Sequence, residues 1–152
     1  HTTIKNNSIF ENTNNGIHSE MSSSYIDILL NNITNHKNAI FVDAKKFLPN
    51  LPKEEYVAQT LAIELYLEAG IRGVEIGTLL ADRDPETREN RYPELELLRL
   101  AIPRRVYTNN HMDVIAVALK NVFDRKEQIT KGYKIVSEAP IMRHFTVELE
   151  KA

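Results

Sequence analysis

The chain has 152 residues, enough for one domain with a buried core. Hydrophobic residues make up 42% and charged residues 26%, which is typical of a globular protein and not of a disordered one. The net charge of −2 offers no basic surface for nucleic acid or an anionic membrane. There is no cysteine for disulfides or thiolate metal sites, and no apolar run approaches the roughly 18 residues of a membrane helix. No signal-peptide core is visible either, so a cytoplasmic protein is expected.

The first residues differ in composition from the rest. Residues 1–24 are rich in Asn, Ser and Thr, and their few apolar residues follow no period. Such a stretch cannot bury enough surface to offset the entropy of ordering it, so we predict a flexible or non-native leader. A short helix is predicted at residues 25–33. Because the chain begins with His1 and not with Met, we expect a processed start or a piece of a longer chain.

Beyond the leader the pattern becomes regular. Residues 39–42 form a short apolar run, which predicts a buried strand. Residues 53–69 carry apolar side chains at i, i+3, i+4 and i+7, which predicts a helix that ends at Gly70. Residues 71–79 and 95–102 alternate between apolar and polar residues and are predicted strands, joined by a long polar connection.

The second half repeats this alternation of helix and strand. Thr108 is the expected N-cap of a helix with the same apolar spacing, and residues 133–136 and 145–149 are predicted strands. The resulting order β-α-β-β-α-β predicts an α+β domain of the ferredoxin-like type, with two helices on one face of a small sheet. Because such domains serve many functions, this order alone predicts none of them.

Arg99 is the most informative polar residue. Strand alternation places it on one face with Leu97 and Ala101, while the neighbouring leucines point to the other face. An arginine within so apolar a strand is costly unless an anion meets it. Its planar guanidinium suits a carboxylate, which it can bind by two parallel hydrogen bonds. A structural ion pair with a local acid, or a solvent-exposed place on an edge strand, is the alternative.

Two further residues allow more than one interpretation. His144 stands at the entry of the last predicted strand, where it could line a site and exchange a proton near neutral pH. A surface or capping role for His144 is the alternative. Glu75, inside a predicted strand, is equally ambiguous. No two histidines stand at i, i+4 on a predicted helix, so no metal site is expected.

Six segments carry a resemblance to a known family. They are FVDAKKFLP (41–49), AGIRGVEIG (69–77), RDPET (83–87), LLRLAIPRRVYT (97–108), HMD (111–113) and MRHFT (142–146). Their order and spacing across about residues 39–152 resemble the C-terminal small domain of the β-eliminating lyases, the family of tryptophanases and tyrosine phenol-lyases. The resemblance implies a fold-type I enzyme that uses pyridoxal phosphate.

The resemblance also implies roles for three residues. Arg99 matches the arginine that grips the substrate α-carboxylate. Ile76 stands where phenol-lyases carry an arginine facing the substrate ring, and His144 stands where they carry a phenylalanine. Both positions therefore resemble the tryptophanase branch, in which Ile76 would form an apolar wall for indole and His144 would be the catalytic histidine. The implied reaction converts tryptophan to indole, pyruvate and ammonia.

Other parts of the family pattern have no counterpart in this sequence. The motif of the lysine that binds the cofactor, the phosphate-binding loop and the potassium-binding residues are absent, and in the family they belong to a large domain. We therefore expect residues 25–152 to be a small domain without cofactor or metal ligands, inactive alone. Its expected partners are that large domain and further copies in a tetramer. A stand-alone ferredoxin-like module that binds amino acids or another protein is the alternative.

Overall fold

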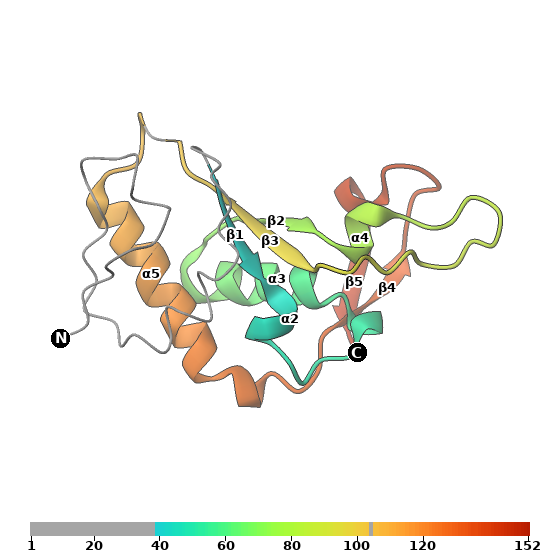
Figure 1. Ribbon diagram of the computed structural model, residues 1–152, viewed down its shortest axis with the longest axis horizontal. Helices are drawn as coiled ribbons and strands as arrows, with labels where there is room; N and C mark the ends of the chain where they lie inside the picture. Colours follow the sequence, from blue (N-terminus) through green and yellow to red (C-terminus); the bar gives the residue numbers. More distant parts are fainter. Residues whose placement is uncertain (1–38, 104) are drawn as a thin grey trace.

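The computed structural model describes residues 39–103 and 105–152 (Figure 1). The predicted leader at residues 1–24 and the predicted helix at residues 25–33 lie outside the described residues. The proposed domain boundary at residue 25 therefore stays a prediction. Within the described part, helices and two small antiparallel sheets form an α+β domain, as predicted.

A three-stranded antiparallel sheet forms the centre of the domain. Its middle strand is β3 (Leu97–Ala101), with β1 (Ala39–Asp43) on one side and β2 (Val74–Ile76) on the other. The two leucines of β3 at 98 and 100 are buried, whereas Arg99 between them is half-buried on the opposite face. The predicted alternation of this strand is thus confirmed, with one face in the core and the other carrying Arg99.

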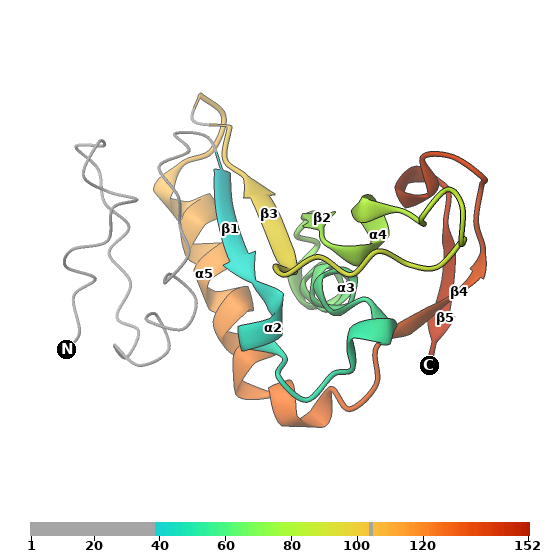
Figure 2. The same ribbon diagram turned by 45° about the vertical axis from the view of Figure 1, so that its right-hand side comes forward.

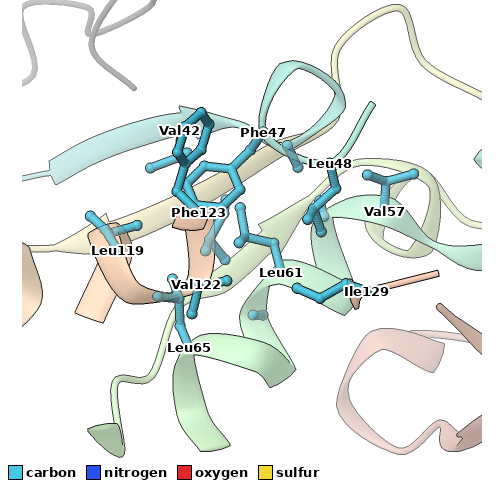
Figure 3. Close-up of a cluster of buried hydrophobic side chains, with 14 of the residues drawn as sticks. Val42, Phe47, Leu48, Val57, Leu61, Leu65, Leu119, Val122, Phe123 and Ile129 are labelled. Atoms are coloured by element: carbon cyan, nitrogen blue, oxygen red, sulfur yellow. The ribbon is translucent and has the colours of Figure 1, made fainter. Parts of the chain in front are cut away.

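Two helices cover the core face of this sheet. They are α3 (Val57–Ala69) and α5 (Asn109–Asp124), which also pack against each other (Figures 1 and 2). Figure 3 shows their apolar side chains meeting those of β1 and of the short helix α2 (Ala44–Phe47). The buried side chains at the centre are Val42, Phe47, Leu61, Leu65, Leu98, Leu119, Val122 and Phe123. The predicted packing of both helices on one face of the sheet is confirmed.

The ends of the two long helices follow local chemistry. Gly70 adopts a left-handed φ of 68° after α3, and its N–H donates to the carbonyl of Tyr66 at 2.8 Å. The N–H of Thr108 donates to Nδ1 of His111 at 3.1 Å. A side chain in the first turn of α5 thus supplies a hydrogen-bond acceptor for the backbone N–H of the N-cap residue. Both predicted helix boundaries are confirmed.

The predicted start of the helix at residues 53–69 is wrong. Residues 53–69 form two pieces, the 3₁₀ turn η1 (Lys53–Glu55) and α3, separated by Tyr56. Tyr56 has a left-handed φ of 49°, which breaks the helical path, and its ring is 4% exposed. The helix is thus interrupted where the side chain of Tyr56 is buried. The helical spacing of apolar residues in the sequence does not show such an interruption.

The last two strands do not join the first sheet. β4 (Tyr133–Ser137) and β5 (Glu148–Lys151) pair with each other as a separate hairpin, which lies away from β1 (Figure 2). The order β1-β3-β2 with antiparallel pairing is a split β-α-β arrangement, but the last predicted strand pairs in the separate hairpin and not in this sheet, so the complete ferredoxin-like order is not confirmed. A cross-strand ion pair between Lys134 and Glu150, 3.0 Å apart, favours the observed pairing.

Two predicted strands are also shorter than expected. The strand predicted at residues 71–79 ends at Ile76 because a helical turn, α4 (Thr78–Ala81), follows at once. The strand predicted at residues 145–149 begins only at Glu148, after the 3₁₀ turn η3 (Arg143–Phe145). A further 3₁₀ turn, η2 (Lys126–Gln128), follows α5. Both α4 and η3 belong to a buried polar cluster described below.

Candidate functional site

Arg99 lies on the face of the central strand that points away from the core. Its partners in the register are Phe41 on β1 and Val74 on β2, neither of which can neutralise a guanidinium. Within residues 39–103 and 105–152, no carboxylate forms an ion pair with Arg99. Of the two alternatives for this residue, the edge-strand position does not apply because β3 is the middle strand. A half-buried arginine in apolar surroundings is suited to an external carboxylate.

Ile76 shares this sheet face with Arg99. It is the last residue of β2 and lies opposite Leu97, which is two residues before Arg99 on the same side of β3. The side chain of Ile76 is half-buried. A cationic group and an apolar group therefore stand side by side on one face, an arrangement that can hold the carboxylate and the apolar part of one small molecule.

His144 belongs to the turn η3 and not to a strand entry, so its expected local structure is wrong. Its ring lies 4.1 Å from that of Phe145, centroid to centroid, and is half-buried. The turn η3 packs against α4, which begins two residues after Ile76 (Figure 1). The structure thus brings Arg99 and Ile76 onto one face and places His144 on the element next to it, without a direct contact of His144 to either.

Arg143, next to His144, is the residue that the sequence patterns missed. It is 1% exposed, and its guanidinium donates to the carbonyls of Leu79 (3.0 Å) and Thr78 (2.7 Å). It also donates to Oδ1 of Asn90 at 2.7 Å and to Oε2 of Glu138 at 3.2 Å. A buried charge with four hydrogen bonds is stably accommodated, whereas loss of its partners would be costly. No apolar period marks such a residue in the sequence.

Two buried glutamates accept the backbone N–H groups at the start of the same turn, α4. Oε1 of Glu96 accepts the N–H of Thr78 at 2.8 Å and also its hydroxyl, and Glu96 is 1% exposed. Glu75 accepts the N–H groups of Leu79 (3.0 Å) and Leu80 (2.9 Å). These contacts satisfy N–H groups at the start of α4 that have no partner within the helix. They account for the early end of β2.

Glu75 is also electrostatically unusual. Burial, partly offset by its two backbone hydrogen bonds and reinforced by the nearby carboxylate of Glu96, raises the pKa of Glu75 from 4.5 to about 7. Arg143 acts in the opposite direction but more weakly. The Glu75 carboxyl is therefore partly protonated near neutral pH, a property that its place in the sequence does not indicate.

This raised pKa predicts a pH-dependent stability. Below about pH 4.5 Glu75 is protonated in the folded and unfolded states alike. Between pH 4.5 and 7 only the unfolded state releases its proton, so the free energy of unfolding falls as pH rises, by roughly 3 kcal/mol at most, and the effect levels off above pH 7. Glu75→Gln should therefore flatten the profile measured by urea denaturation between pH 5 and 8.

The exposed Glu148 on β5 supplies the matched control. Glu148→Gln should change the free energy of unfolding by a similar small amount at every pH. If Glu75→Gln loses stability with rising pH as steeply as the parent chain does, Glu75 is not the group that titrates.

The described residues do not fit a cofactor bound as an imine. A lysine that forms such a bond is activated by desolvation or by a neighbouring cation, and none of the described lysines is buried. The described residues also include no group of three His, Asp or Glu side chains that could hold a metal ion. No helix in residues 39–103 and 105–152 is long and apolar enough to cross a membrane.

Fold and site together define a small α+β domain that presents an arginine and an apolar side chain on one sheet face. Residues 20–118 match the family model of the beta-eliminating lyases. The chain therefore belongs to the β-eliminating lyase family.

Relatives of both branches of the family are similar to this chain. A probable beta-eliminating lyase of Trichomonas vaginalis is 73% identical over 114 residues, which are 75% of this chain and 25% of the relative. A tyrosine phenol-lyase of Nostoc punctiforme is 50% identical over 113 residues, 74% of this chain and 24% of the relative. A tryptophanase of Escherichia coli is 46% identical over 126 residues, 83% of this chain and 26% of the relative. The chain spans about a quarter of the length of these curated relatives, and overall identity does not choose between the branches.

Proposed function

We propose that this chain is the substrate-gripping small domain of a lyase that cleaves tryptophan to indole, pyruvate and ammonia. The observation that carries the proposal is the shared sheet face of Arg99 and Ile76. On this proposal, Arg99 binds the α-carboxylate by two parallel hydrogen bonds. Ile76 covers the indole ring, whose burial is favourable by about 25 cal/mol per Å² of apolar surface.

His144 is proposed as the catalytic histidine of the site wall. An imidazole can donate or accept a proton near neutral pH and can support the departure of the indole ring. Its position on η3, packed against the α4 turn that follows Ile76, supports a place at the edge of the same site. The substrate would lie between the Arg99 face and this turn.

The other three quarters of the length of the family's proteins are proposed to supply the cofactor-binding groups that residues 39–152 lack. Pyridoxal phosphate, when bound there, serves as the electron sink for the substrate carbanion. Potassium, a tetrameric assembly and a cytoplasmic location belong to the same proposal for the whole protein. Residues 25–152 would be its small domain, with residues 1–24 as a leader.

The proposal is tested with two matched samples, each supplied with pyridoxal phosphate and tryptophan. One is the 152-residue chain, and the other is a full-length lyase in which residues 39–152 replace the equivalent segment of the Trichomonas vaginalis relative. We expect indole from the full-length lyase and none from the 152-residue chain. Faster phenol release from tyrosine than indole release from tryptophan would overturn the choice of substrate. Indole from the 152-residue chain would overturn its proposed inactivity.

A further inference from the structure

The turn that carries His144 is held by one buried side chain. Around it, Ile141, Met142 and Phe145 are 73%, 58% and 72% exposed, so apolar burial contributes little to the position of this turn. Arg143 is the exception at 1% exposed. The position of His144 therefore depends on the hydrogen bonds of its neighbour.

Those hydrogen bonds lead to the segment that follows Ile76. The guanidinium of Arg143 binds the carbonyls of Thr78 and Leu79, which are two and three residues beyond Ile76. It reaches them through different nitrogens, Nη2 and Nε, so the plane of the guanidinium is fixed relative to α4. Nη1 bonds to Asn90 and Glu138 and fixes the remaining side of the group.

The same network continues to the strand of Arg99. Thr78 accepts a bond from Arg143 with its carbonyl, while its N–H and hydroxyl donate to Glu96. Glu96 directly precedes β3, in which Arg99 is the third residue. One buried chain of hydrogen bonds thus links the backbone next to His144, the backbone after Ile76 and the start of β3.

We propose that Arg143 is a positioning residue that fixes His144 relative to Ile76. The inference rests on the proposed function, in which both of these side chains contact the ring of the substrate. Displacement of a positioned group by about 1 Å can reduce a rate by up to a hundredfold. The effect of Arg143 should therefore appear with substrates that carry a ring and should be small with substrates that lack one.

The first experiment measures this split in the full-length lyase. Arg143→Lys keeps the charge but cannot reproduce the planar set of hydrogen bonds. We expect kcat/KM for the preferred ring substrate, tryptophan or tyrosine, to fall by about 10- to 100-fold. For S-methylcysteine, which has the same α-carboxylate and no ring, we expect a change below about threefold. Equal losses with both substrates, or no loss with the ring substrate, would overturn the proposal.

Arg125 provides the matched control because it is a partly buried arginine at the end of α5 that pairs with Glu64 and Glu68 of α3 and not with η3 or α4. Arg125→Lys should change kcat/KM for both substrates by the same small factor. The comparison uses whichever ring substrate the parent enzyme prefers. If that substrate is tyrosine, the proposed tryptophan specificity is refuted, but the comparison with S-methylcysteine still tests the role of Arg143.

The second experiment does not depend on activity. In NMR spectra of the 152-residue chain, Arg143→Lys should shift the Ile76 methyl and His144 imidazole resonances together and leave the core methyls of Leu61 and Leu119 in place. Arg125→Lys should shift neither site resonance. If Arg143→Lys prevents folding, Asn90→Ala removes only one acceptor of the guanidinium and should shift the same two resonances. Unchanged His144 and Ile76 resonances in folded Arg143→Lys or Asn90→Ala would refute the positioning role. This result does not depend on whether the proposed lyase function is correct.

Discussion

Replacing Arg99 with alanine is expected to lower kcat/KM of the full-length lyase by at least about a hundredfold for every amino acid substrate. The proposed loss is that of two charge-assisted hydrogen bonds to the α-carboxylate, each worth about 1.5–3 kcal/mol. Because this carboxylate is common to tryptophan, tyrosine and S-methylcysteine, the loss should be similar for all three. It should appear mainly in KM, measured by initial rates over a range of substrate concentrations.

A matched control is Arg72→Ala, which removes an exposed arginine shortly before β2. This change should leave kcat/KM within about twofold of the parent, because surface substitutions outside a site have small effects. A loss for Arg99→Ala confined to one substrate would contradict carboxylate binding. It would instead indicate a contact of Arg99 with the substrate ring.

Replacing Ile76 with arginine is expected to change the preference between ring substrates. In the parent site an apolar wall leaves the hydroxyl of tyrosine without a partner, at a cost of about 1–3 kcal/mol. An arginine at this position can donate to that hydroxyl and no longer buries the indole ring. The ratio of kcat/KM for tryptophan to that for tyrosine should therefore fall by about 10- to 100-fold.

Val74→Arg is the control on the same strand. Val74 lies on the same face as Ile76 but directly opposite Arg99, and it is 47% exposed. A second cation there would act on the α-carboxylate that tryptophan and tyrosine share. The values of kcat/KM for both substrates should therefore change by a similar factor. If Ile76→Arg also changes both substrates by the same factor, discrimination between rings does not lie at residue 76.

Much of the central domain follows from patterns within single elements. The apolar spacing of α3 and α5, the stop at Gly70 and the cap at Thr108 each depend on residues within a few positions of one another. The alternation in β3 likewise placed Arg99 on one face and the leucines at 98 and 100 on the other, whereas the structure showed that the leucine face is the core face. Such local signals can be found in one sequence because a helical turn or a strand face repeats over short distances.

The resemblance to the family depended on motifs of the same short range. It placed Arg99, Ile76 and His144 in a common site, and the match of residues 20–118 confirmed the family. It did not decide the substrate, because phenol-lyases and tryptophanases are similarly close to this chain. The preference for tryptophan rests on residues 76 and 144, and Ile76→Arg tests the first of them directly.

Only the tertiary structure decided how the last two strands pair and what surrounds α4. The strands β4 and β5 have weak apolar alternation, so periodicity could not show that they pair with each other and leave β1 alone. Arg143 is separated by 64 and 65 residues from the carbonyls that it binds, and Glu96 by 18 residues from Thr78. A buried polar group is stable only where folding brings all its partners together, and a single sequence contains no local signal of that meeting. The sequence by itself therefore determined the apolar faces of α3 and α5, the alternation of β3 and the family, whereas the position of His144 relative to Ile76 was decided by long-range hydrogen bonds of Arg143.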